Sequence, residues 1–338
     1  MSLLIPREVY QLLSAVAAPV TFGLICFVLS WVYPRRIVSL PTSGRRTSTL
    51  TWAGVAGALL VIVVAFVVHV STPADTTGFE GWWRRPAPLL VAALVVTVAM
   101  FLVRREPLPA PGEAAVAPQR RWNEFASRPL LWVGAVIAAL LALTSVWQTV
   151  IATSAPADAF FLGNVPEHTT LPIYMPFNAN YGYIAGVGWP NYLATLITLV
   201  LAVAALVLAL RTDANRPLRA RSTATSVRPE RELTARLFTL LLLGGLITTL
   251  GAVWMHAGDI GTIIVGVEGQ TTADGNLIYV GSAYRAFAQP LLYAGFLGQG
   301  IGIALLLRVA TDTLRSAAAL RRARRPLIET IPFDGVTQ

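Results

Sequence analysis

Seven long apolar segments, separated by polar segments, dominate the pattern of hydrophobic and polar positions along the chain. An apolar run of about 18 to 25 residues is long enough to cross the roughly 30 Å hydrocarbon layer of a membrane as a helix. We place the spans at residues 10–33, 51–70, 86–103, 129–153, 190–210, 237–256 and 290–307. The sequence therefore predicts an all-α polytopic membrane protein with seven transmembrane helices, in which residues 1–338 form a single transmembrane domain.

The distribution of arginine predicts the orientation of these spans. The segments that follow spans one, three, five and seven contain 22 Arg and 9 acidic residues, whereas the N-terminus and the other loops contain 4 Arg and 8 acidic residues. Because arginine-rich loops stay in the cytoplasm, we expect the N-terminus outside and the basic tail at 308–338 inside. The expected location is the plasma membrane, specifically a bacterial cytoplasmic membrane.

The charge composition narrows the possible functions. Charged residues form 13% of the chain, whereas soluble domains are about a quarter charged. The net charge of +9 does not indicate nucleic-acid binding, because no binding motif accompanies it. Lysine is absent, which excludes a retinal Schiff base. The seven predicted spans contain no charged residue, which disfavours ion-coupled transporters, pumps and voltage sensors.

Short similarities predict an internal repeat of three helix–loop–helix units after a leading helix. The sequence STPAD at 71–75 resembles SAPAD at 154–158, and VPEHTT at 165–170 resembles VEGQTT at 267–272. Duplicated hairpins are common in transporters and also occur in scaffolds. The repeat therefore does not choose between these functions.

Two long outer loops, 154–189 and 257–289, are predicted to form a small extracellular cap, because loops of this length usually have structure or function. Beta-branched runs at 262–267 and 277–280 flank a turn-forming segment, a pattern typical of a β-hairpin near 262–280. We expect the two loops to share an apolar core. In that core, Val265, Val267, Ile278 and Tyr279 would face Phe160, Phe161, Ile173 and Tyr174.

Aromatic, acidic and histidine residues of the outer side form the predicted ligand or partner surface. These residues are Trp147, Glu167, His168, Trp189, Trp254, His256, Asp259 and Glu268. The tryptophans are also typical of the aromatic belt at a membrane interface. His69, His168 and His256 are weak candidates for metal ligands, but their spacing matches no metal motif, and histidines are common at interfaces. No metal or other cofactor is predicted.

The inner side carries a basic helix that continues from the last span. Its Arg315, Arg321, Arg322, Arg324 and Arg325 are expected to attract anionic lipids at the cytoplasmic face, with an acidic cytoplasmic partner as the alternative. Within the last span, Gly298 and Gly302 have the spacing that lets helices pack closely. Their partner is either an internal helix or another subunit.

Three classes of function agree with this sequence. The first is a non-catalytic subunit or sensor of a plasma-membrane assembly, with other membrane-protein subunits as partners, that presents its outer loops to a ligand or partner. The second is a permease or channel for a small solute or lipid, with a pathway lined by Thr144, Gln148, Thr248 and Gln299. The third is a membrane enzyme acting on a lipid-linked substrate at the outer face, with acids drawn from Asp75, Asp158, Glu167, Asp259 and Glu268. No nucleotide-binding, zinc-protease or serine-hydrolase motif is present.

Overall fold

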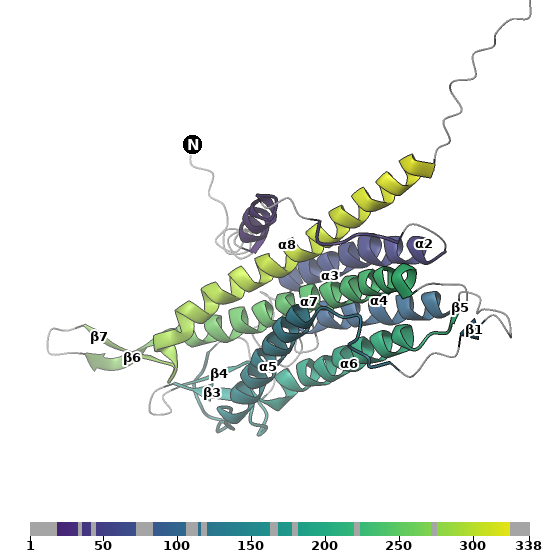
Figure 1. The fold of residues 1–338 in the computed structure, drawn as a ribbon. Helices are drawn as coiled ribbons and strands as arrows, with labels where there is room; N and C mark the ends of the chain where they lie inside the picture. Colours follow the sequence, from purple (N-terminus) through teal and green to yellow (C-terminus); the bar gives the residue numbers. More distant parts are fainter. Residues whose placement is uncertain are drawn as a thin grey trace, which may run out of the picture.

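The computed structural model describes residues 19–32, 36–41, 45–71, 84–105, 114–115, 120–162, 168–177, 182–219, 224–271 and 276–324. Within this part of the chain, six helices are long and apolar enough to cross a membrane (Figure 1). The first runs continuously through α2 (Arg45–Trp52), the π-helical turn η1 (Ala53–Gly57) and α3 (Ala58–Ser71). The others are α4 (Ala87–Arg104), α5 (Arg128–Val150), α6 (Trp189–Ala214), α7 (Ala224–Thr262) and α8 (Arg285–Arg324).

These six helices coincide with the last six predicted spans, but the first predicted span, 10–33, is not matched by a helix of spanning length. Its described part is a shorter apolar helix, Pro19–Leu29, and residues 10–18 lie outside the described ranges. This helix packs on α8, because a Cβ added to Gly23 would lie 3.5 Å from the carbonyl oxygen of Gly300. The described residues thus show six spanning helices instead of seven.

Proline marks the beginning of three helices, where its missing N–H breaks no helical hydrogen bond. Pro88, Pro129 and Pro190 occupy the first or second position of α4, α5 and α6. At its other end, α8 runs far past the predicted boundary at residue 307. Its 40 residues span about 60 Å at 1.5 Å per residue, roughly twice the hydrocarbon thickness.

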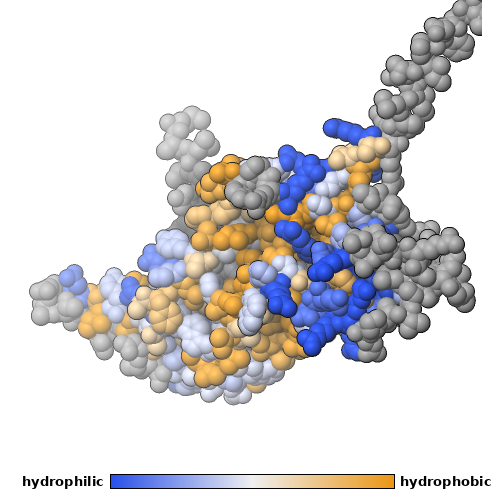
Figure 2. Space-filling view, viewed as in Figure 1, coloured by the Kyte–Doolittle hydropathy of each residue, from blue (hydrophilic) through white to orange (hydrophobic). Residues whose placement is uncertain are grey.

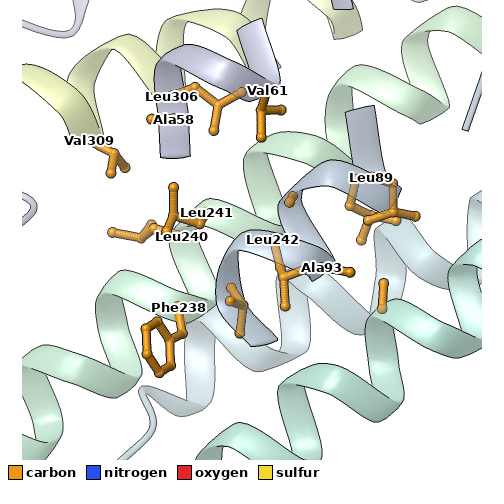
Figure 3. Packing of buried hydrophobic residues seen from close by; sticks show 14 of the residues in the cluster. Ala58, Val61, Leu89, Ala93, Phe238, Leu240, Leu241, Leu242, Leu306 and Val309 are labelled. Carbon is orange, nitrogen blue, oxygen red and sulfur yellow. The ribbon is translucent and has the colours of Figure 1, made fainter. Parts of the chain in front are cut away.

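Helix α7 is the central helix of the bundle, and α5 is the most peripheral. The apolar window of α7 is 83% buried inside the protein, against 11% for α5. Helix α7 contacts α4, α5, α6 and α8. The core around it includes Ala58 and Val61 from α3, Leu89 and Ala93 from α4, Phe238 and Leu240–Leu242 from α7, and Leu306 and Val309 from α8 (Figure 3).

Glycines let α7 and α8 approach closely. A Cβ added to Gly302 would lie 2.2 Å from the hydroxyl oxygen of Thr248, and one added to Gly298 would lie 3.2 Å from the Cα atom of Gly251. A Cβ atom could not approach Thr248 so closely, and a Cβ at residue 298 would be in a tight contact. The small-residue spacing of Gly298 and Gly302 therefore serves packing against α7 of the same chain.

Short strands lie at both ends of the bundle (Figure 1). At the cap end, β2 (Phe161–Leu162), β4 (Tyr183–Ala185) and β3 (Tyr174–Pro176) form a sheet in that order, and β6 (Ile264–Thr271) pairs antiparallel with β7 (Leu277–Gly281). The hairpin expected near 262–280 is therefore present. At the opposite end, β1 (Ala114–Ala115) pairs with β5 (Leu218–Arg219).

Hydrophilic residues concentrate at this opposite end, here called the basic end (Figure 2). The chain has no lysine, and arginine makes the ion pairs of the described residues, which include Arg46 with Asp213 at 2.7 Å and Arg308 with Asp312 at 3.5 Å. The Arg308 and Arg315 guanidinium groups also lie 3.6 and 3.9 Å from the ring centroid of Trp31. These charges lie beyond the predicted span boundaries, so the predicted spans remain uncharged although the longer helices are not.

Candidate functional site

The two long loops of the cap end pack into one apolar core. Met175, Phe177 and Ile184 from the first loop cluster with Ile260 and Tyr284, and Val265 and Val280 of the hairpin pack against them. Phe177 and Ser282 also form a β-bridge between the loops. This finding confirms the expectation that the loops share a core, and we call this structure the cap.

The expected pairing of residues within the cap is partly wrong. The side chains of Ile278 and Tyr279 are 37% and 60% exposed. The hairpin projects beyond the bundle (Figure 1), so only its base reaches the core, and Tyr279 lies on the strand face opposite Val280. Phe161, Ile173 and Tyr174 belong to a separate cluster of the first loop, and Phe160 is exposed. The Val267 side chain lies outside the described residues.

Hydrogen bonds tie the cap to the helix ends. The Tyr284 hydroxyl donates to the carbonyl oxygen of Ala257 at 2.9 Å, and the Ser282 hydroxyl donates to that of Gly261 at 2.9 Å. The imidazole Nε2 of His256 lies 3.1 Å from the carbonyl oxygen of Gly186. The cap is therefore bonded to α7 at successive turns.

The turn between β4 and α6 depends on glycine. Gly186 and Gly188 have φ angles of 125° and 95°, which other residues adopt only with strain. A Cβ added to Gly188 would also lie 2.1 Å from the carbonyl oxygen of Pro172. The turn brings the Gly188 N–H to 3.2 Å from the carbonyl oxygen of Gln148, its hydrogen-bond acceptor, and so fixes the beginning of α6 beside the end of α5.

A group of buried polar side chains lies where the cap meets the bundle, and we call it the polar cluster. Its members are Arg85, Gln148, Asn191, Tyr192, Thr195, His256 and Tyr284. The Arg85 guanidinium acts electrostatically on both Tyr192 and His256, and Tyr192 acts on Tyr284. Asn191 and Thr195 flank Tyr192 on α6 at a spacing of four residues, which places them on one helix face. The polar cluster thus joins the ends of α4, α5, α6, α7 and α8.

Several polar atoms of the cluster have no hydrogen-bond partner among the described residues. They are Oδ1 of Asn191, the hydroxyl of Tyr192 and the hydroxyl of Thr195, on side chains that are at most 1% exposed. Neither polar atom of the Gln148 amide has a hydrogen-bond partner among the described residues, although the side chain lies near the Tyr284 hydroxyl. Buried polar groups are normally paired, and an unsatisfied one costs about 1–3 kcal/mol. An ordered water or a small polar molecule would satisfy these atoms.

Tyr284 can act only as a neutral hydroxyl in this position. Burial raises the pKa of Tyr284, and the nearby Tyr192 raises it further. The hydroxyl therefore stays protonated and keeps its hydrogen bond to Ala257.

The structure brings two of the predicted surface residues to the polar cluster. Trp147 packs edge-on against Tyr284, with ring centroids 4.9 Å apart, and His256 is itself a member. Trp254 donates a hydrogen bond to the Thr144 hydroxyl at 3.0 Å, lower in the bundle. These three side chains make contacts within the protein and are partly buried.

The other predicted surface residues lie apart. His168 stacks on Tyr174 with centroids 6.4 Å apart, and Trp189 and Asp259 are exposed. Glu167 and the side chains of His69 and Glu268 lie outside the described residues. In the described part of the chain, no three His, Cys, Asp or Glu side chains form a group that could hold a metal ion.

The predicted basic surface is exposed where the structure describes it. Arg315 contacts the ring of Trp31, Arg321 and Arg322 lie on the last turns of α8, and all three side chains are exposed. The side chain of Arg324 and all of Arg325 lie outside the described residues. Contact of this helix with anionic lipid therefore remains a prediction that rests on the exposed arginines.

Sequence reasoning missed Arg85, Asn191, Tyr192 and Thr195. Arg85 was counted only as an outer-loop charge, although its side chain is 3% exposed. The signal for the α6 residues was present, since three polar residues share one face in the first turns of a largely apolar span.

Comparison with known proteins finds no family model that matches the chain, no similar curated protein and no similar solved structure.

Proposed function

We propose that this protein is a non-catalytic subunit or sensor of a plasma-membrane assembly that binds a ligand or partner at its capped end. One observation carries this proposal: beneath the cap, the buried side chains of Gln148, Asn191, Tyr192 and Thr195 each have at least one polar atom with no hydrogen-bond partner among the described residues. Small-molecule sites typically combine an apolar lining with a few convergent polar groups. The polar cluster would supply such polar groups beneath the cap. The exposed hairpin residues Leu277, Ile278 and Tyr279 offer a separate surface to a protein partner.

The proposal includes the predicted topology, with seven spans, the N-terminus outside and the cap outside. The asymmetric distribution of arginine supports this orientation. The helix Pro19–Leu29 supports a seventh span, because it packs on α8 while Leu24, Val28 and Leu29 are more than half exposed, as lipid-facing residues would be.

The contacts of the candidate pathway residues favour binding over permeation. The Thr144 hydroxyl donates to the Leu140 carbonyl and accepts from Trp254, the Thr248 hydroxyl donates to the Gly244 carbonyl, and the Gln299 amide lies 3.2 Å from the sulfur of Met255. Of the four candidates, only Gln148 belongs to the polar cluster. Below the cluster, the bundle is filled by apolar side chains and by close glycine contacts between α7 and α8.

An enzymatic function receives less support from the described acids. Asp158 and Asp259 are exposed, and an acid–base pair would need two such acids in one cleft. Asp75, Glu167 and the side chain of Glu268 lie outside the described residues.

Native mass spectrometry of the full-length protein from its own membrane tests the proposed function. The wild type is expected to retain a small molecule and a stoichiometric protein partner. Gln148→Leu should lose the small molecule, because Leu removes the amide at similar volume, while the control Gln299→Leu should keep it. Tyr279→Ser should lose the protein partner and keep the small molecule.

Thermal unfolding provides the second readout. If the polar cluster binds a ligand, extracts of the native membrane will raise the Tm of the wild type and of Gln299→Leu but not of Gln148→Leu. Equal ligand retention and equal Tm shifts in both variants would contradict the proposal, and so would a wild type that retains neither a small molecule nor a partner.

A further inference from the structure

A lateral groove on the membrane-facing side of the bundle is not used by the polar cluster. It has a volume of about 380 Å³, with walls from α5 and α6 and a floor from α7 and α4. We propose that this groove binds one acyl chain of an anionic phospholipid, with the headgroup at the basic end. Leu131 and Gly134 of α5, Leu206 of α6 and Leu242 of α7 line it.

Small residues keep the groove open. Gly134, Ala135 and Ala138 share the face of α5 that borders the groove, and a Cβ added to Gly134 would meet no atom within 4 Å. Helix α5 is also the least buried of the spanning helices. An apolar space that opens to the bilayer loses dispersion contacts when empty, so a hydrocarbon chain is the occupant that its lining favours.

The length of the groove matches one leaflet. It is lined from Leu130 to Ala138 on α5 and from Leu199 to Val207 on α6. At 1.5 Å per residue these segments are about 12 Å long, close to half of the roughly 30 Å hydrocarbon layer. The groove begins near Trp122, at the basic end, so the chain enters from the leaflet on that side.

Positive charge at the mouth selects the headgroup. Arg128 precedes Leu131 by one helical turn, and Arg236 precedes Thr239 by one turn, so both lie on the groove-facing stripes of α5 and α7. Both side chains are exposed. The acid Glu232 pairs with Arg228 at 2.7 Å, and Glu124 also acts on Arg228. Two arginines beside an interfacial tryptophan suit an anionic phosphate group.

Photocrosslinking in nanodiscs tests this site. The probe is phosphatidylglycerol with a diazirine in its acyl chain, and the labelled peptides are identified by mass spectrometry. We expect labelling of residues 130–138 and 199–207 in the wild type and its loss in Gly134→Trp, whose ring fills the groove. The matched control is Val136→Trp, on the far side of α5, where the side chain is 55% exposed and does not line the groove. Gly134→Leu, a smaller change, should reduce labelling partially.

A competition experiment tests the headgroup preference without any substitution at Gly134. Unlabelled phosphatidylglycerol should displace the probe better than phosphatidylcholine, and Arg128→Gln and Arg236→Gln should each reduce that preference about fivefold. Equal labelling of Gly134→Trp and Val136→Trp, or equal competition by the two lipids, would overturn the proposal. Protein crosslinks to α5 in place of lipid labelling would assign the groove to a partner helix and would also overturn it.

Discussion

The Tyr284 hydroxyl donates a hydrogen bond to the carbonyl oxygen of Ala257, 2.9 Å away, across the boundary between cap and bundle. Tyr284 follows the hairpin and Ala257 lies in α7, so this bond joins a surface loop to the central helix. Its ring also packs against Trp147 of α5 and belongs to the cap core. This one side chain therefore joins the cap to two helices, α7 and α5.

Substitution of Tyr284 by Phe should destabilise the cap. The change removes one of the hydrogen bonds to the Ala257 carbonyl, which lies within α7, at an expected cost of about 0.5–1.5 kcal/mol in the free energy of unfolding. Tyr293→Phe is the control, because Tyr293 lies on α8 with 55% of its surface exposed. Chemical unfolding in detergent measures both variants, and an equal effect of the two would contradict the assigned contact.

Tyr284 should also give the protein a dependence on alkaline pH. Burial raises the pKa of Tyr284 in the folded protein, whereas an unfolded tyrosine ionises near pH 10. Above about pH 10 the unfolded chain loses a proton that the folded protein keeps, so the stability contributed below that pH is lost as the pH rises. The difference in unfolding free energy between wild type and Tyr284→Phe should shrink above pH 10. A difference that is constant with pH would contradict the buried position of the hydroxyl.

The ion pair of Arg46 and Asp213 should be important for the stability of the basic end. The pair joins α2 to α6 with side chains only 11% and 9% exposed, and Arg46 also donates to the Thr234 hydroxyl of α7. Arg46→Gln should cost about 3–5 kcal/mol, because it leaves the Asp213 carboxylate buried without its partner. The double variant Arg46→Met, Asp213→Leu should recover much of the loss.

The exposed pair of Arg228 and Glu232 provides the control for this measurement. Its side chains are 69% and 47% exposed, so Arg228→Gln should change the unfolding free energy little. Similar losses from Arg46→Gln and Arg228→Gln would show that burial does not distinguish the two pairs.

The predicted orientation can be tested by cysteine labelling in intact cells. In a Cys26→Ser background, cysteines placed at Gly163 and Gly275 should react with an impermeant thiol reagent from outside. Cysteines at Ser43 and Ala224 should react only after the membrane is permeabilised, because arginine-rich loops stay inside. The reverse pattern would place the cap in the cytoplasm.

The apolar pattern predicted the spanning helices well because hydrophobic length is a local property of the chain. The predicted span 86–103 differs by one residue at each end from α4, Ala87–Arg104. The apolar pattern did not predict where helices continue beyond the hydrocarbon layer, as α8 does. Its continuation contains charged residues, such as the buried pair of Arg308 and Asp312, which an apolar pattern does not detect.

The candidate site was harder to predict because it depends on contacts between distant segments. In the sequence, Arg85 is a charged residue of a predicted loop. It is buried near Tyr192 and His256 only because α4 packs beside α6 and α7. The hairpin itself was predictable from its β-branched runs. The exposure of Tyr279 was not, because it depends on how far the hairpin projects from the bundle.

Amide hydrogen exchange of the protein in nanodiscs tests the central claim, that the cap is an ordered structure bonded to the bundle. We predict slow exchange in β3 and β4, whose residues pair and are mostly buried, and faster exchange at the exposed Leu277. Gly188→Ala should accelerate exchange in β3 and β4, since its Cβ would meet the Pro172 carbonyl, whereas Gly266→Ala, whose Cβ meets nothing closer than 3.6 Å, should not. Fast exchange through β3 and β4 in the wild type would show independent loops and contradict the account.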